Sequence, residues 1–223
     1  MELKDCKVYV VGGDEELHKW LPDTEMVSDM KEADLVIFGP GPDVSPTYYG
    51  EKPGEHTKCD AKRDQADMEE CDKAKKLGKK LLGIGRGAQL LTVLAGGKLI
   101  QHAKGHEMNG THMVDTYNGA NLYIESKHHQ MMYPYNMDKN NYIVIGWTQK
   151  KLSDEYLDGS GELVKVPKDF GEVEMALYQN IDAFCIQGHM HKMAPKALGV
   201  TETVKLVATF MTMKFKKTKR KRK

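Results

Sequence analysis

The side chains best suited to chemistry in this sequence are four histidines in two short segments. His189 and His191 lie in CIQGHMH, and His128 and His129 lie in SKHHQ. An imidazole changes its charge near neutral pH, so such residues can relay protons, and their neutral rings can bind zinc or copper. The H-x-H spacing at a strand end would place the rings of His189 and His191 on one side.

A further segment predicts the turn that such histidines would face. Residues 81–84 form an apolar strand, Gly85-Arg86-Gly87 turns sharply, and a helix follows from about Ala88 to the glycine pair 96–97. This pattern is typical of a nucleophile elbow. It lifts residue 85 above the carboxyl edge of the sheet, with the N–H groups of a helix N-terminus behind it. The tip is glycine, which has no side chain to form a covalent bond.

Taken in order, several motifs resemble those of class I glutamine amidotransferases, and more closely the peptidase C26 branch of γ-glutamyl hydrolases. The matching segments are GIGRGAQ (family G-I-C-R-G-x-Q), PGPDVSP (G-G-x-D-V-x-P), the pair Arg63-Asp64 (R-D), SKHHQ (S-x-H-H-Q) and CIQGHMH (V-Q-W-H-P-E). With the elements around them they cover residues 6 to about 211. The resemblance implies a three-layer, flavodoxin-like α/β fold. Its central sheet would be mostly parallel, with helices on both faces and a smaller antiparallel strand region.

The resemblance also implies a reaction. In that family a cysteine thiolate attacks the side-chain amide of glutamine or a γ-glutamyl bond, a histidine relays the proton and a glutamate orients the histidine. The motifs carry these roles to Gly85, His189 and His191. Only His189 has the expected residue type. We therefore expect a chain that is catalytically inactive or an inactivated variant.

The rest of the pocket is implied in the same way. The oxyanion donors would be the backbone N–H groups of Gly41 and Arg86, since Pro40 and Pro42 have none. Neither a cofactor nor a metal is implied. The residues expected at the substrate are Gln89, Ser126, His128 and His129.

Three functional hypotheses stay open. The first is a glutaminase or γ-glutamyl hydrolase that is inactive in this form or uses another route. The second is a binding or regulatory pseudoenzyme that recognises a glutamine-like ligand or a partner protein. The third is a metal site in the same cleft, built from the four histidines at 128, 129, 189 and 191. Glycine at position 85 is either natural or engineered, and the histidine at 191 favours natural loss.

The cysteines do not supply an evident replacement nucleophile. Cys185 shares a strand with His189 and is expected to point into the core, whereas Cys59 lies in a loop. The four scattered cysteines are typical of reduced thiols, and there is neither a secretory signal pattern nor an apolar run of roughly 20 residues. We expect a cytoplasmic protein without a membrane partner.

The elements that position these segments follow a strand–helix alternation. Apolar runs predict strands near 6–11, 35–38 and 79–84, and helical spacing predicts helices at 63–78, 88–95 and 201–211. Short strand-like runs fill 98–187. The helix at 63–78 should bury one apolar face: Ala66, Met68, Cys71, Ala74 and Leu77. The remaining histidines expected to be surface or loop residues are His102, His106 and His112.

Composition bounds the domain and its partners. The 223 residues are 40% hydrophobic and 29% charged, which suits one domain over residues 1–213. Residues 214–223 hold eight of the basic residues and no acidic one, which predicts a basic disordered tail open to weak contact with a polyanion. The expected partners are a glutamine or γ-glutamyl small molecule and, as in many amidotransferases, a synthase protein.

Overall fold

The computed structural model describes residues 3–215, apart from the side chain of Asn109. None of the helices in this range is long and apolar enough to span a bilayer. The helices and strands, in chain order, are β1 (Lys7–Val10), η1 (Glu15–Leu17), β2 (Glu25–Met26), β3 (Leu35–Phe38), η2 (Pro46–Tyr49), α1 (Ala61–Lys76), β4 (Lys80–Ile84), α2 (Arg86–Ala95), β5 (Lys98–Ile100), β6 (His102–Ala103), β7 (Glu107–Thr116), β8 (Asn121–Lys127), β9 (Met131–Tyr133), η3 (Pro134–Asn136), β10 (Tyr142–Thr148), β11 (Tyr156–Leu157), β12 (Val173–Tyr178), β13 (Ala183–Ile186), η4 (Met190–Lys192) and α3 (Leu198–Thr212).

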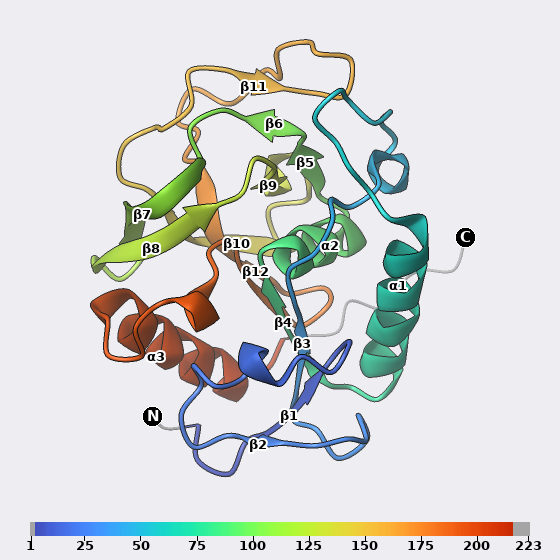
Figure 1. Ribbon diagram of the computed structural model, residues 1–223, viewed down its shortest axis with the longest axis vertical. Helices are drawn as coiled ribbons and strands as arrows, with labels where there is room; N and C mark the ends of the chain where they lie inside the picture. Colours follow the sequence, from blue (N-terminus) through green and yellow to red (C-terminus); the bar gives the residue numbers. More distant parts are fainter. Residues whose placement is uncertain (1–2, 216–223) are drawn as a thin grey trace.

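A single twisted sheet runs through the molecule in the order β2-β1-β3-β4-β13-β12-β10-β7-β8 (Figure 1). The strands from β2 to β13 are parallel to one another. From β12 onward the pairings are antiparallel, so the antiparallel region expected from the sequence extends the same sheet. Because β4 and β13 are parallel neighbours, the loops that follow them meet at one edge of the sheet.

Helices cover both faces of the parallel strands, and the predicted fold class is confirmed. Successive strand residues point to opposite faces, and the core divides accordingly. On one face, α3 packs through residues such as Val207 and Phe210 against Val8, Ile37 and Ile84. On the other face, α1 and α2 pack on the alternate strand residues.

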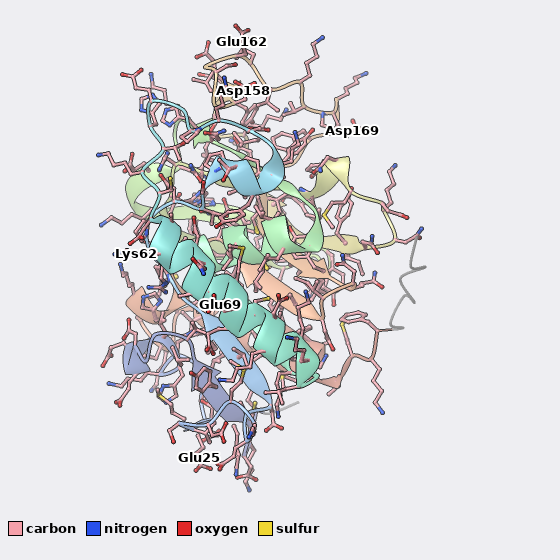
Figure 2. All side chains as sticks on the ribbon, turned by 90° about the vertical axis from the view of Figure 1, so that its right-hand side faces the viewer. Glu25, Lys62, Glu69, Asp158, Glu162 and Asp169 are labelled. Atoms are coloured by element: carbon pink, nitrogen blue, oxygen red, sulfur yellow. The ribbon has the colours of Figure 1, made fainter. Side chains whose placement is uncertain are left out.

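Helix α1 lies on the outside of the molecule, and its rotation corrects the predicted apolar face. Figure 2 shows Lys62 and Glu69 pointing outward from this helix. Ala66 and Leu77 are exposed. The buried side chains are Asp64, Asp67, Cys71 and Ala74. Two aspartates therefore face the interior, because each has an arginine partner there.

The chain termini carry two predictions that lie partly beyond the described range. Residues 216–223, most of the predicted basic tail, lie outside the described residues. Just before them, Phe215 packs near Phe210 with ring centroids 6.5 Å apart. The Lys80 ammonium donates to the carbonyl of Met213 at 2.9 Å, which ties the end of α3 to β4.

Candidate functional site

Gly85 forms the tip of a tight strand-to-helix turn. Strand β4 ends at Ile84 and α2 begins at Arg86, so one residue makes the whole change of direction. Gly85 has φ 57° and ψ −117°, a conformation that side-chain-bearing residues adopt only with strain. The elbow also needs Gly87, since a Cβ there would come within 2.0 Å of the Phe38 carbonyl oxygen. The local sequence therefore dictates this turn.

His189 reaches the elbow from the neighbouring strand. Ile186, at the end of β13, pairs in register with Ile84, and it accepts the Gly85 N–H at 2.9 Å. His189 follows three residues later. A Cβ built on Gly85 would lie 2.6 Å from Nε2 of His189. The imidazole thus occupies the space next to the elbow where a nucleophile's side chain would begin.

The carboxylate that orients this imidazole comes from Glu125 in β8. Its Oε2 lies 3.0 Å from Nδ1 of His189 and accepts the backbone N–H of His189 at 3.1 Å. Burial raises the pKa of Glu125, but the contacts with His189 outweigh burial and hold that pKa below its usual value. His191 does not take this position, because its ring centroid lies 5.7 Å from that of His189. The predicted role of position 191 is corrected accordingly.

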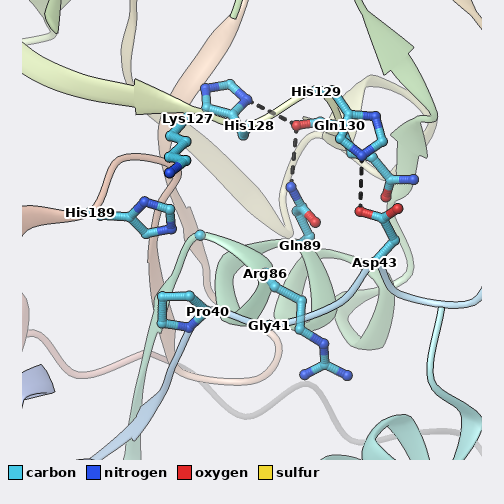
Figure 3. A pocket seen from close by; sticks show the side chains of 11 residues that line it. Pro40, Gly41, Asp43, Arg86, Gln89, Lys127, His128, His129, Gln130 and His189 are labelled. Carbon is cyan, nitrogen blue, oxygen red and sulfur yellow. Dashed lines mark hydrogen bonds and ion pairs between the residues drawn. The ribbon is translucent and has the colours of Figure 1, made fainter. Parts of the chain in front are cut away.

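A cavity of about 160 Å³ opens in front of the elbow (Figure 3). Its wall combines the loop after β3, the start of α2, the segment after β8, and His189. Among the predicted site residues, Ser126 and His191 are not part of it. Ser126 is fully buried and donates to the carbonyl of His106 at 2.7 Å. The lining residues are Pro40, Gly41, Asp43, Gly85, Arg86, Gln89, Lys127, His128, His129, Gln130 and His189.

The two predicted oxyanion donors, Gly41 and Arg86, both line this cavity. First-turn N–H groups of a helix have no partner inside the helix, so the Arg86 amide is suited to an anion. The Arg86 side chain points away from the cavity in Figure 3. It is buried and pairs with Asp64 at 2.5 Å and with Asp67. These pairs anchor the elbow to α1.

Asp64 also holds the loop after β3. Its Oδ2 accepts the backbone N–H of Ser45 at 2.9 Å. Because Asp64 binds Arg86 as well, one carboxylate links the elbow to the loop that carries Gly41. This explains why the R-D pair matters for the pocket although Asp64 does not line it.

The carbonyl of Gln130 organises the opposite wall. It accepts hydrogen bonds from Nε2 of Gln89 at 3.2 Å, Nε2 of Gln187 at 3.2 Å and Nδ1 of His128 at 3.0 Å. Gln89 is thereby fixed from α2 to the segment after β8. The Nε2 of Gln89 is used by the protein itself, so its amide oxygen is the group left for a ligand.

His129 and Lys127 complete the polar lining. His129 Nε2 lies 3.2 Å from Oδ1 of Asp43, and this contact outweighs burial and raises the pKa of His129. Lys127 is exposed and its side chain reaches over the cavity toward His189 in Figure 3. Sequence reasoning missed both Lys127 and Asp43. Their positions inside the two matched motifs, SKHHQ and PGPDVSP, were the available signal.

The expectation that His106 and His112 are surface or loop residues is wrong. Their exposed fractions are 0% and 5%, and they lie beside the buried Glu174. His128 turns toward this group, with Nε2 3.5 Å from Glu174, while His129 and His189 contact other carboxylates. In the described residues the four histidines of the predicted cleft metal site therefore do not share one centre.

The cysteines fall into two classes. Cys71 and Cys185 are fully buried, and burial raises the pKa of both thiols. Cys59 is exposed, and its backbone forms a bridge with that of Asp43. Cys59 does not line the cavity.

Comparisons with known proteins agree with this geometry. The family model described as Peptidase C26 matches residues 18–144. A glutamine amidotransferase-like protein, YvdE, from Lactococcus lactis is 39% identical over 69 residues, which are 30% of this chain and 29% of the relative's length. The chain thus spans less than a third of that relative in the match.

Solved structures share the fold at low identity. A glutamine amidotransferase from Thermotoga maritima aligns over 92% of this chain and 96% of its own, with a TM-score of 0.51 and 12% identity. The structure of PurLQS from Thermotoga maritima aligns over 92% and 99%, with a TM-score of 0.55 and 16% identity. With the family match spanning more than half of the sequence, the chain belongs to the Peptidase C26 family, within the class I glutamine amidotransferase-like superfamily.

Proposed function

We propose that this chain is a non-catalytic member of its family, which binds a glutamine-like or γ-glutamyl small molecule in the cavity at Gly85 without forming a thioester. One observation carries the proposal. Nε2 of His189 stands 2.6 Å from where a Cβ of residue 85 would be, so the proton relay is in place and the nucleophile is absent. Loss of a triad member typically removes all but about 10³–10⁴-fold of the rate enhancement.

The cavity retains the groups that such a ligand needs. The α2 N-terminus and Lys127 offer positive potential to a carboxylate or a polarised carbonyl. Gln89 and His129 offer polar contacts on the other wall. A volume of about 160 Å³ is small, which favours a single amino-acid side chain over a polyglutamate.

The proposal is tested by binding and turnover measured on the same protein. Titration calorimetry with L-glutamine and with a γ-glutamyl amide should show binding, and ammonia or amine release should stay at the level of a blank. Turnover that disappears in His189→Ala would overturn the proposal. The Cys59→Ser variant serves as the matched control, because it removes the one exposed thiol in the described residues without touching the cavity lining.

Restoration of the thiol tests the shape of the pocket. Gly85→Cys should react with an electrophilic glutamine analogue, because Glu125 already orients His189. A further His191→Glu change should then add little. Gly85→Ala carries the same backbone strain without a thiol and should not react. A folded Gly85→Cys variant that resists the analogue would count against a glutamine-shaped pocket.

A synthase partner is the second part of the proposal. The fold shared with the PurLQS structure supports it, since that title names an assembly. Co-purification of the tagged chain from its own organism, with and without glutamine, tests this part. Recovery of the chain without a stoichiometric partner under both conditions would reject it. Contact of the tail with a polyanion stays a prediction.

A further inference from the structure

A second group of ionisable side chains lies in the interior, behind the cavity wall. Glu174 in β12 has an exposed fraction of 0%, and neither of its carboxylate oxygens makes an aligned hydrogen bond within the described residues. One oxygen, Oε1, is surrounded by three imidazole nitrogens. Its neighbours are His106 Nδ1 at 3.3 Å, His112 Nε2 at 3.1 Å and His128 Nε2 at 3.5 Å.

The state of His128 shows what is missing from this group. Its Nδ1 donates to the carbonyl of Gln130, and burial lowers the pKa of the ring, so the imidazole is neutral. The remaining nitrogen, Nε2, then carries a lone pair that faces the Glu174 oxygen. Two acceptors repel each other unless a cation lies between them. A backbone carbonyl that holds one nitrogen while the other is free is the usual arrangement around a metal-bound histidine.

His106 has a corresponding arrangement with a different anchor. Its Nε2 lies 3.2 Å from Oε2 of Glu172, and its Nδ1 faces Glu174. Glu172 is itself fixed by hydrogen bonds from neutral donors, so it remains a carboxylate. Carboxylate–histidine–metal relays are built in this way. The donors to Glu172 are Thr148 Oγ1, Tyr156 Oη and the backbone N–H groups of Leu152 and Ser153.

The charge of the group also calls for a cation. Glu172 and Glu174 are both fully buried, and neither pairs with a lysine or arginine in the described part of the chain. Buried carboxylates without a counter-charge are very costly. A proton on His106 supplies one positive charge, in line with a pKa that burial lowers but the two glutamates raise to about 9. A divalent ion would supply both charges and satisfy the unpaired atoms.

We propose that His106, His128 and Glu174, with His112 as the fourth ligand, bind a structural Zn²⁺ ion in the interior. The ligand atoms of the first three residues lie within 4.8 Å of one another. Tetrahedral zinc with bonds of about 2.0–2.1 Å separates neighbouring ligands by about 3.3 Å, which matches the spread of 3.1–3.5 Å around Oε1. All four ligands are buried, so the site is closed, as structural zinc sites are.

The site would join separate parts of the sheet. His112 lies in β7, His128 follows β8 and Glu174 lies in β12. His128 also lines the cavity and shares the Gln130 carbonyl with Gln89. The ion would thus hold the cavity wall in place from behind, without touching a ligand in the cavity.

Metal content of the full chain is the direct test. The chain is purified without a histidine tag from zinc-supplemented medium and dialysed, and plasma mass spectrometry should find about one zinc per chain. Removal of the metal by a chelator should lower the melting temperature by about 5 °C or more, and Zn²⁺ alone should restore it. Co²⁺ added to the metal-free chain should give the intense visible bands of a tetrahedral site.

Variants locate the ion. Glu174→Gln and His112→Gln should each lose most of the zinc, whereas His56→Gln should keep it. His56 is the matched control, because it is exposed and stacks on His102 at 4.1 Å in a surface histidine pair that could bind metal adventitiously. Zinc retained in Glu174→Gln but lost in His56→Gln would overturn the proposal. If the interior variants fail to fold, the cobalt spectrum of the unaltered chain decides, and the absence of tetrahedral bands together with less than about 0.1 zinc per chain rejects the site.

Discussion

Oε2 of Glu125 accepts the backbone N–H of His189 at 3.1 Å and lies 3.0 Å from Nδ1 of the same residue. One carboxylate oxygen therefore fixes both the main chain and the ring that faces the elbow. The side chain of Glu125 is 15% exposed, so the contact is largely shielded from solvent. The geometry of a histidine oriented by an acid is thus complete in a chain whose elbow tip is glycine.

Glu125→Gln should destabilise the fold in a pH-dependent way. The pKa of Glu125 is lowered in the folded chain, so its contribution is present above the unfolded value of 4.5 and is lost as pH falls through the folded pKa. We expect a loss of about 1–2 kcal/mol in the free energy of unfolding at pH 7, shrinking below pH 4.5. Urea unfolding at several pH values measures it. The exposed Glu162→Gln variant is the control, and an equal loss at all pH values would contradict the prediction.

Gly85→Ala should destabilise the chain through both backbone and contact. The positive φ alone costs a non-glycine residue about 1–3 kcal/mol, and the new Cβ must displace His189. Thermal unfolding should show the loss, and adding His189→Ala should recover only the contact part. Gly110→Ala is the matched control: a Cβ there meets nothing within 4 Å, and its φ is not in the left-handed region. An unchanged melting temperature for Gly85→Ala would refute this account of the elbow.

Arg86→Gln should cost far more stability than an ordinary surface change. It leaves Asp64 without its cation and Asp67 with only Arg63, both in the interior. Removing one partner of a buried ion pair costs about 3–5 kcal/mol. Arg63→Gln, whose side chain is 33% exposed, should cost below about 1 kcal/mol. Chemical denaturation compares the two, and equal losses would show that the burial of Arg86 is not decisive.

His189 and His191 should differ in ligand binding. His189 lines the cavity, whereas His191 does not. His189→Ala should weaken binding of a glutamine-like ligand by about tenfold, equivalent to one hydrogen bond, and His191→Ala should change it less than about twofold. Titration calorimetry measures both. A larger effect from His191→Ala would return that residue to the role inferred from its motif.

Local sequence determined the parts of this protein that depend on neighbours in the chain. The apolar run 35–38 became β3 with the bounds predicted, and residues 81–95 became strand, elbow and helix. Those outcomes follow from apolar runs, from a glycine that can adopt positive φ, and from a second glycine where the backbone of β3 approaches. The ordered motifs were enough to place the family and, with it, the fold class.

Only the tertiary structure decided which charged groups meet. Glu125 and His189 are 64 positions apart, and Glu174 meets three histidines from other segments. Such neighbours depend on the register of strands paired across the sheet, which no local spacing encodes. The rotation of α1 has the same origin. Asp64 and Asp67 are polar by sequence and would be expected to face solvent, yet the buried Arg86 makes the interior their more stable location.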